Sequence, residues 1–176
     1  MRLRRVHGLQ HFYLAQLVTT LGHRQKLVTV RCLSGFKVDG MSIELEPFHG
    51  TWKFDPALST MCTPAPHSWV QEISGCSESV AVHEKIVRPD GTGIVSRVQA
   101  KFDGVDYPVE GSPTVDTISY TRADRNAICG IGKKDGRVAV TETVLADPEK
   151  RTLTLIYNYL LGEQSVAHGV AVFQEA

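Results

Sequence analysis

The chain has 176 residues, of which 42% are hydrophobic and 22% charged, and no run of apolar residues approaches 18. This composition predicts one globular domain with a real core and no membrane-spanning helix. The net charge is zero, but most of the chain is acidic, so nucleic acid is not expected as a partner.

Residues 1–40 differ from the rest in charge. They carry seven basic side chains against Asp39, whereas residues 41–176 carry 12 basic and 18 acidic side chains. Three interpretations fit this basic extension: a secretory signal, with arginines before the apolar run from Phe12 to Val18; a mitochondrial-type presequence; or an upstream extension of a protein that starts at Met41. We expect a cytoplasmic protein unless the extension is a targeting segment.

The four cysteines are Cys32, Cys62, Cys76 and Cys129, and no two of them have C-x-x-C spacing. His83-Glu84 lacks the second histidine of an H-E-x-x-H motif. We therefore predict no metal site, and reduced structural thiols. A Cys62–Cys76 disulfide is expected only in an exported protein.

From residue 50 onward, strand and turn signals alternate at short intervals. Gly50–Phe54 predicts the first strand, with Gly50-Thr51-Trp52 as a plug at one end of a barrel, and Asp55–Ser59 predicts a turn. Further strands are predicted over Ser68–Ile73, Glu78–Arg88, Ile94–Phe102, Thr117–Arg122, Ala127–Lys133, Val138–Leu145, Thr152–Leu160 and Val166–Phe173, with a short extended piece at Tyr107–Val109.

These nine or so strands have hairpin-length connections and no crossover helix between them. An up-and-down antiparallel barrel is the natural closure, because it leaves no exposed strand edge. The sequence therefore predicts an all-β protein: a basic extension over residues 1–40 and a barrel of the lipocalin or fatty-acid-binding type over residues 41–176.

Period-two alternation indicates which side chains share a face of each strand. Three apolar faces each carry one polar residue: Glu84, Glu142 and His168. An unpaired carboxylate is costly to bury, so these residues should be paired or face a wet cavity. We predict a ligand site formed by these three residues with Tyr157 and with Trp52 at the rim. The alternative is that each lies at a strand end or on the outer face.

Two motifs carry a resemblance to a known family. Gly50-Thr51-Trp52 with Pro56 and Ser59 matches G-T-W-x-x-x-P-x-x-S, and the segment Asp103–Pro113 matches D-G-x-D-Y-P-V-x-G-x-P. From about Phe48 to the end, the chain resembles a family of small bacterial proteins of unknown function with a lipocalin-like, calycin-type barrel.

The resemblance implies the fold and an expectation of small apolar ligands, but no activity. Fatty-acid-binding relatives hold the ligand carboxylate with an Arg-x-Tyr pair on the last strand, where this chain has Val170-Ala171-Val172-Phe173. A haem-binding barrel would need a placed histidine, for which only His168 is available. No cofactor is therefore predicted.

Three functions are consistent with this sequence. The first is a non-catalytic barrel that binds a small, mostly apolar ligand. The second is an isomerase, cyclase or hydratase that uses Glu84 or Glu142 with His168 as acid and base. The third is a packed scaffold or homodimerisation module, expected if Trp52, Tyr157, Tyr159 and Phe173 fill the interior.

Overall fold

The computed structural model describes residues 47–162 and 164–176, so the predictions on residues 1–40, Met41 and Cys32 fall outside it. The described chain contains no helix, and hence none long and apolar enough to cross a membrane. Its ten strands are β1 (Gly50–Met61), β2 (Ser68–Cys76), β3 (Ser79–Val87), β4 (Gly93–Lys101), β5 (Tyr107–Glu110), β6 (Thr117–Asp124), β7 (Ala127–Lys134), β8 (Arg137–Asp147), β9 (Thr152–Leu161) and β10 (Gln164–Glu175).

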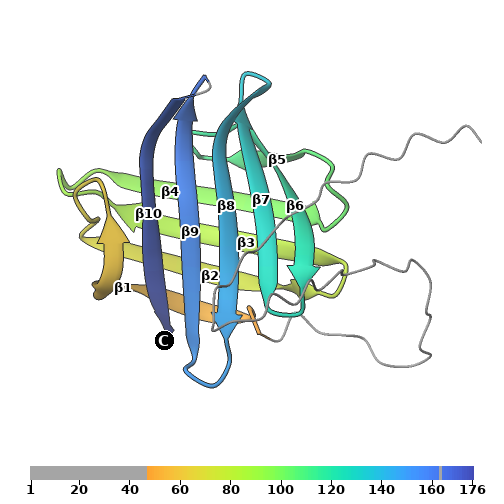
Figure 1. The fold of residues 1–176 in the computed structure, drawn as a ribbon, viewed down its shortest axis with the longest axis horizontal. Helices are drawn as coiled ribbons and strands as arrows, with labels where there is room; N and C mark the ends of the chain where they lie inside the picture. Colours follow the sequence, from red (N-terminus) through yellow and green to blue (C-terminus); the bar gives the residue numbers. More distant parts are fainter. Residues whose placement is uncertain (1–46, 163) are drawn as a thin grey trace, which may run out of the picture. The chain divides into compact units, whose positions relative to one another are not determined.

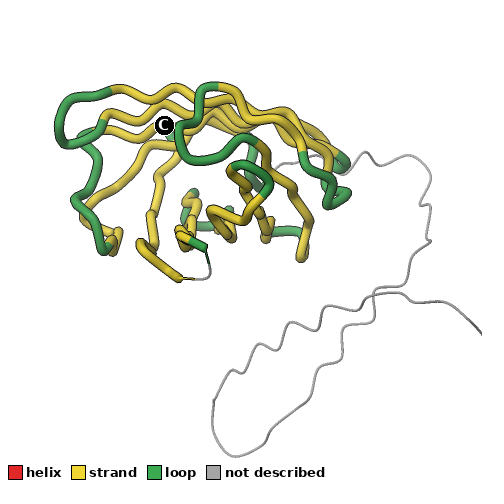
Figure 2. Tube along the Cα trace, turned by 90° about the horizontal axis from the view of Figure 1, so that it is seen from above, coloured by secondary structure: helices red, strands yellow, loops and turns green. Residues whose placement is uncertain are grey.

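The strands form one closed antiparallel barrel in which every strand pairs with its neighbours in sequence and β1 pairs with both β2 and β10. The strands β6–β10 cross in front of β2–β4 at a steep angle (Figure 1). Figure 2 shows the strands from above, where they curve around a common interior. The predicted all-β up-and-down barrel is confirmed.

Strand β1 differs from its prediction, because it continues to Met61 where a turn was expected at Asp55–Ser59. Its pairing with β10 shifts register between Asp55 and Thr60, and this irregularity contains Pro56, which has no N–H to donate. Ser59 compensates: its Oγ donates to the Asp55 carbonyl at 2.6 Å and accepts the Val172 N–H at 2.9 Å. The turn residues therefore bend a strand rather than end it.

The β4–β5–β6 region has the fewest pairing residues in the barrel. Strand β5 pairs with β4 at two positions, Arg97 and Val98, and with β6 at two more. Gly111 follows at φ +75°, and a Cβ there would lie 2.1 Å from the Val95 carbonyl oxygen. Gly111 therefore packs closely against β4, whereas the end of the following segment contacts β7, where the Asp116 N–H donates to the Lys133 carbonyl at 2.7 Å.

The apolar core fills one half of the barrel. Phe48, Leu153 and Phe173 are fully buried, and the Trp52 indole closes this end by donating to the Phe48 carbonyl at 2.8 Å. The Trp69 ring lies 5.1 Å from the Phe173 ring, edge to face, and marks the inner limit of this packing. This half of the interior is packed with side chains, as expected for a scaffold or homodimerisation module.

Candidate functional site

The other half of the interior contains a cavity of about 100 Å³. Two rows of inward-facing side chains line it, each made of directly opposed residues on adjacent strands. The Glu84 row consists of Gln71, Glu84 and Ser96 on β2, β3 and β4. The Glu142 row consists of Tyr120, Gly130, Glu142, Tyr157 and Gly169 on β6 to β10.

In the Glu84 row, the carboxylate accepts three hydrogen bonds. The Trp69 indole donates to Oε1 at 2.7 Å and the Gln71 amide donates to the same oxygen at 3.0 Å. The Ser96 hydroxyl donates to Oε2 at 3.1 Å. Hydrogen bonds from three side chains fix the carboxylate in one orientation. Glu84 is therefore a preorganised carboxylate inside the barrel.

In the Glu142 row, glycines make room for the polar side chains. A Cβ at position 130 would lie 2.7 Å from Glu142 Cγ and 2.9 Å from a Tyr120 ring carbon. A Cβ at position 169 would lie 2.6 Å from the Tyr157 hydroxyl. Any other residue would push these side chains from their places, so Gly130 and Gly169 position the row.

The electrostatic environment of Glu142 differs from that of Glu84. The pKa of Glu142 is raised to about 7, first by burial in the barrel and second by the negative charge of Glu84. The Tyr120 hydroxyl opposes the shift. A carboxyl with this pKa gains and loses its proton near neutral pH, as general acids and bases do.

The tyrosine hydroxyls of the cavity are kept protonated. Burial raises the pKa of Tyr120 and of Tyr159, and the charges of Glu142 and Glu84 add to both shifts. Burial also raises the pKa of Tyr157. At neutral pH these groups can act as hydrogen-bond donors to an acceptor in the cavity.

The cavity approaches the surface at the weakly paired seam of the barrel. Ser112, Thr114 and Val115, from the segment between β5 and β6, contribute to its wall. This segment lies beside the part of β4 that has no β5 partner, since pairing there begins at Arg97.

Three of the five predicted site residues line the cavity: Glu84, Glu142 and Tyr157. Trp52 is buried in the apolar half and is not part of the cavity wall. The prediction that His168 faces inward is wrong, because it is exposed on β10 opposite Asn158.

The error at His168 has a clear cause in β10. The valines of this strand form its outer face, whereas its inner face consists of Gly169, Ala171 and Phe173. Small inner residues are needed where the Tyr157 hydroxyl and the core side chains occupy the space. The alternation of valines therefore predicted as the inner face of β10 the face that lies on the outside of the barrel.

Sequence reasoning did not assign Trp69, Gln71, Ser96, Tyr120 or Tyr159 to the site, although all five line the cavity. Two of them, Gln71 and Ser96, could have been predicted from the alternation of their strands. Gln71 lies between Trp69 and Ile73 in the alternation of β2, and Ser96 precedes the inward residues Val98 and Ala100. A polar residue on an apolar face was the criterion that found Glu84, and it applies equally to these two.

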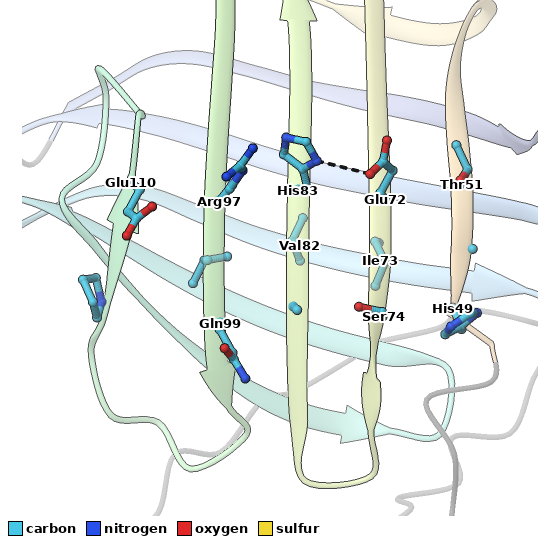
Figure 3. A pocket seen from close by; sticks show the side chains of 14 residues that line it. His49, Thr51, Glu72, Ile73, Ser74, Val82, His83, Arg97, Gln99 and Glu110 are labelled. Atoms are coloured by element: carbon cyan, nitrogen blue, oxygen red, sulfur yellow. Dashed lines mark hydrogen bonds and ion pairs between the residues drawn. The ribbon is translucent and has the colours of Figure 1, made fainter.

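A second depression lies on the outside of the barrel, across strands β1 to β5 (Figure 3). It is an open groove of about 690 Å³, hollowed where the small residues Ser74 and Ala81 face solvent. A transverse row of Glu72, His83 and Arg97 runs along it, each directly opposite the next.

Glu72 is the paired charge of the outer groove. It accepts from Lys85 at 2.9 Å and contacts His83 Nδ1 at 3.2 Å, and these two contacts, the first being the stronger, lower the pKa of Glu72. Exposed pairs of this kind are screened by water and contribute little. We place the candidate site in the interior cavity, because two carboxylates lie on its wall.

Metal ligands and thiols are the remaining candidates among residues 47–162 and 164–176. No three His, Cys, Asp or Glu side chains gather there in a way that could hold a metal ion. Cys62, Cys76 and Cys129 are free thiols, and the first two are exposed.

Comparison with known proteins adds no assignment to this geometry. No protein family model matches the chain, and none of the curated proteins matches it. The cavity and its two carboxylates are the features of the barrel that point to a function.

Proposed function

We propose that the barrel binds one small polar molecule in its interior cavity, with Glu84 and Glu142 as the anchoring groups. The observation that carries this proposal is a cavity with two carboxylates on its wall. Among residues 47–162 and 164–176, the one cationic residue of that wall is Arg97, which is exposed and lies opposite Glu110. Glu84 and Glu142 are both half-buried, and a carboxylate that loses part of its water is costly unless a partner satisfies it.

The size of the cavity restricts the ligand. A volume of about 100 Å³ equals roughly three water molecules in the liquid. Pockets for drug-sized ligands span about 300–1,000 Å³. The volume therefore argues against a lipid, a retinoid or haem, and it replaces the mostly apolar ligand expected from sequence with a compact polar one.

Ligand-observed NMR with small polar compounds, each of no more than about six heavy atoms, tests the proposal. Val109 faces the cavity and Val95 is exposed on the outer face of β4. Val109→Phe should fill the cavity and abolish saturation transfer from the protein to the bound compound. Val95→Phe, the matched control, should leave it unchanged.

Two results would contradict interior binding. One is a screen in which no compound receives saturation from the wild-type protein. The other is a compound whose binding survives Val109→Phe in a folded variant, because that compound must lie elsewhere on the protein.

A second candidate function is proton-transfer catalysis at the same site, favoured by the pKa of about 7 at Glu142. Glu142 would take the α-proton of a small carbonyl substrate and return a proton or deuteron from solvent, while the protonated hydroxyl of Tyr120 or Tyr159 donates to the enolate oxygen. His168 cannot supply the second group from its exposed position. Deuterium exchange at the α-carbon of a small carbonyl compound such as hydroxyacetone should be accelerated by the wild type and not by Glu142→Gln.

The membership of a lipocalin-like bacterial family also stays a proposal. The closed antiparallel barrel supports it, since an up-and-down barrel that encloses a ligand site is the architecture of that group. A homodimer remains a further hypothesis, for which the oligomeric state in solution is the test.

A further inference from the structure

We infer that the interior site takes a small organic cation that carries N–H donors, of the amidinium, guanidinium or primary ammonium type. This inference rests on the proposed function, because it names the chemical class of the ligand that the cavity binds. Four properties of the cavity support the inference. These are its negative charge, the hydrogen-bond acceptors of its carboxylates, its volume and the aromatic side chains on its wall.

The charge balance of the interior favours a cation. Both carboxylates face the same cavity, and each acts on the other groups inside it, including Tyr120 and Tyr159. Among the described residues, Arg97 contributes to the cavity wall and the charge of Arg88 reaches Tyr159, but both arginines are exposed at the surface of the barrel. A cation in the cavity would supply the missing opposite charge, whereas an anion would add to the repulsion.

The hydrogen-bonding capacity of the carboxylates also favours a ligand with donors. A carboxylate can accept about four hydrogen bonds, and Glu84 accepts three from Trp69, Gln71 and Ser96. Glu142 has Tyr120 as its hydrogen-bonding neighbour, so most of its acceptor positions are free. A planar amidinium or guanidinium group presents N–H donors in the geometry that a carboxylate accepts in pairs.

The size and walls of the cavity match such a group. A cation of about four heavy atoms fits a space equivalent to roughly three waters. The side chains of Trp69, Tyr120, Tyr157 and Tyr159 line the same cavity. Their ring faces attract a desolvated cation and offer nothing comparable to a neutral or anionic isostere.

The test compares three compounds that share one shape and differ in charge: acetamidinium, acetamide and acetate. The chain has two tryptophans, so a ¹⁵N spectrum contains two indole N–H signals. The Trp69 indole donates to Glu84 and reports on the cavity, whereas the Trp52 indole donates to Phe48 and serves as an internal control. Titrations of the full chain at about pH 8 give the affinity from the shift of the Trp69 signal.

We expect acetamidinium to bind at least about tenfold more tightly than acetamide, and acetate not to bind. The affinity for acetamidinium should fall several-fold from about pH 8 to about pH 6, because protonation of Glu142 removes half of the interior charge. Glu142→Gln should weaken binding and abolish this pH dependence. Glu110→Gln, an exposed glutamate on the outer face, should change neither.

Three outcomes decide between the proposals. Equal or tighter binding of acetamide or acetate would overturn the inference and leave the proposed function standing. Failure of all three compounds to move the Trp69 signal would overturn the inference; if the small-compound screen also finds no interior binder, the proposed function falls as well. A shift by acetamidinium that persists in Val109→Phe would place the cation outside the cavity and overturn the inference.

Discussion

The Glu84 row and the Glu142 row differ in the number of hydrogen-bond donors that surround the carboxylate of each. In the Glu84 row, neighbouring strands supply three donors, and the charge is held by hydrogen bonds. In the Glu142 row, the neighbours on β7 and β10 are glycines, and the remaining partners are tyrosines. Glu84 is therefore a structural residue, whereas Glu142 has a pKa of about 7.

This difference shows that the donors on adjacent strands determine whether an interior carboxylate is held by hydrogen bonds or is available to a proton or a ligand. Donors at 2.7–3.1 Å occupy three acceptor positions of Glu84 and fix its side chain. Glycines provide space and no donors, so the Glu142 carboxyl is left available for a proton or for a ligand.

The largest expected effect comes from removing each carboxylate in turn. Glu84→Leu should destabilise the fold by about 4 kcal/mol, because three donors lose their acceptor. Glu142→Leu should leave stability at about pH 8 unchanged or raise it, because a costly interior charge is removed. Urea denaturation of both variants measures the contrast, and equal losses would contradict the distinction between the rows.

The pH dependence of stability sharpens the comparison. The pKa of Glu142 rises from an ordinary 4.5 to about 7 on folding, so the folded state binds the proton more tightly than the unfolded state. Stability should therefore fall by about 3 kcal/mol as the pH rises through this interval, and level off above about pH 7.

The appropriate measurement is the difference in unfolding free energy between the wild type and Glu142→Gln across this pH range. The exposed carboxylates whose pKa values are lowered, such as Glu72 and Asp116, contribute the opposite slope to both proteins and cancel. Parallel pH profiles of the two proteins would show that Glu142 does not bind its proton more tightly in the fold.

A smaller effect tests the role of glycine in the Glu142 row. Gly130→Ala should destabilise the protein by about 2 kcal/mol and displace the Glu142 side chain, since its Cβ would enter the space of Glu142 and Tyr120. Gly93→Ala is the matched control, because a Cβ at that strand position meets nothing within 4 Å. Thermal denaturation of the pair should show a loss only for the first variant.

The smallest effect is expected outside the barrel. Glu72→Gln removes the partner of Lys85 and His83 in the outer groove. Because water already screens this exposed pair, the urea midpoint should stay within the error of the measurement. A clear loss of stability would show that the outer groove holds a stronger charge network than its exposure suggests.

The sequence predicted the barrel because its turn signals and strand spacing are local. Hairpins such as the one at Asp135-Gly136, with φ values of 50° and 73°, carry their turn type in adjacent residues. Two carboxylates on apolar faces, Glu84 and Glu142, were also recognisable from alternation within single strands.

The rest of the site depends on residues that meet only across the barrel. His168 was assigned to the wrong face because valines occur on the outside of β10, where packing against Tyr157 leaves room only for small residues inside. The pairing of Ser96 with Glu84 is a cross-strand contact that periodicity cannot reveal. The cavity volume depends on every strand at once, so no single segment predicts it.

The central claim is that Glu142 is an interior carboxyl that lacks a charged partner, and a ¹³C titration of the side-chain carboxyl signals tests it most directly. The account predicts one carboxyl with a midpoint of about 7, and the absence of that signal in Glu142→Gln. A titration in which every carboxyl has a midpoint below about 5, the range of ordinary Asp and Glu side chains, would contradict it.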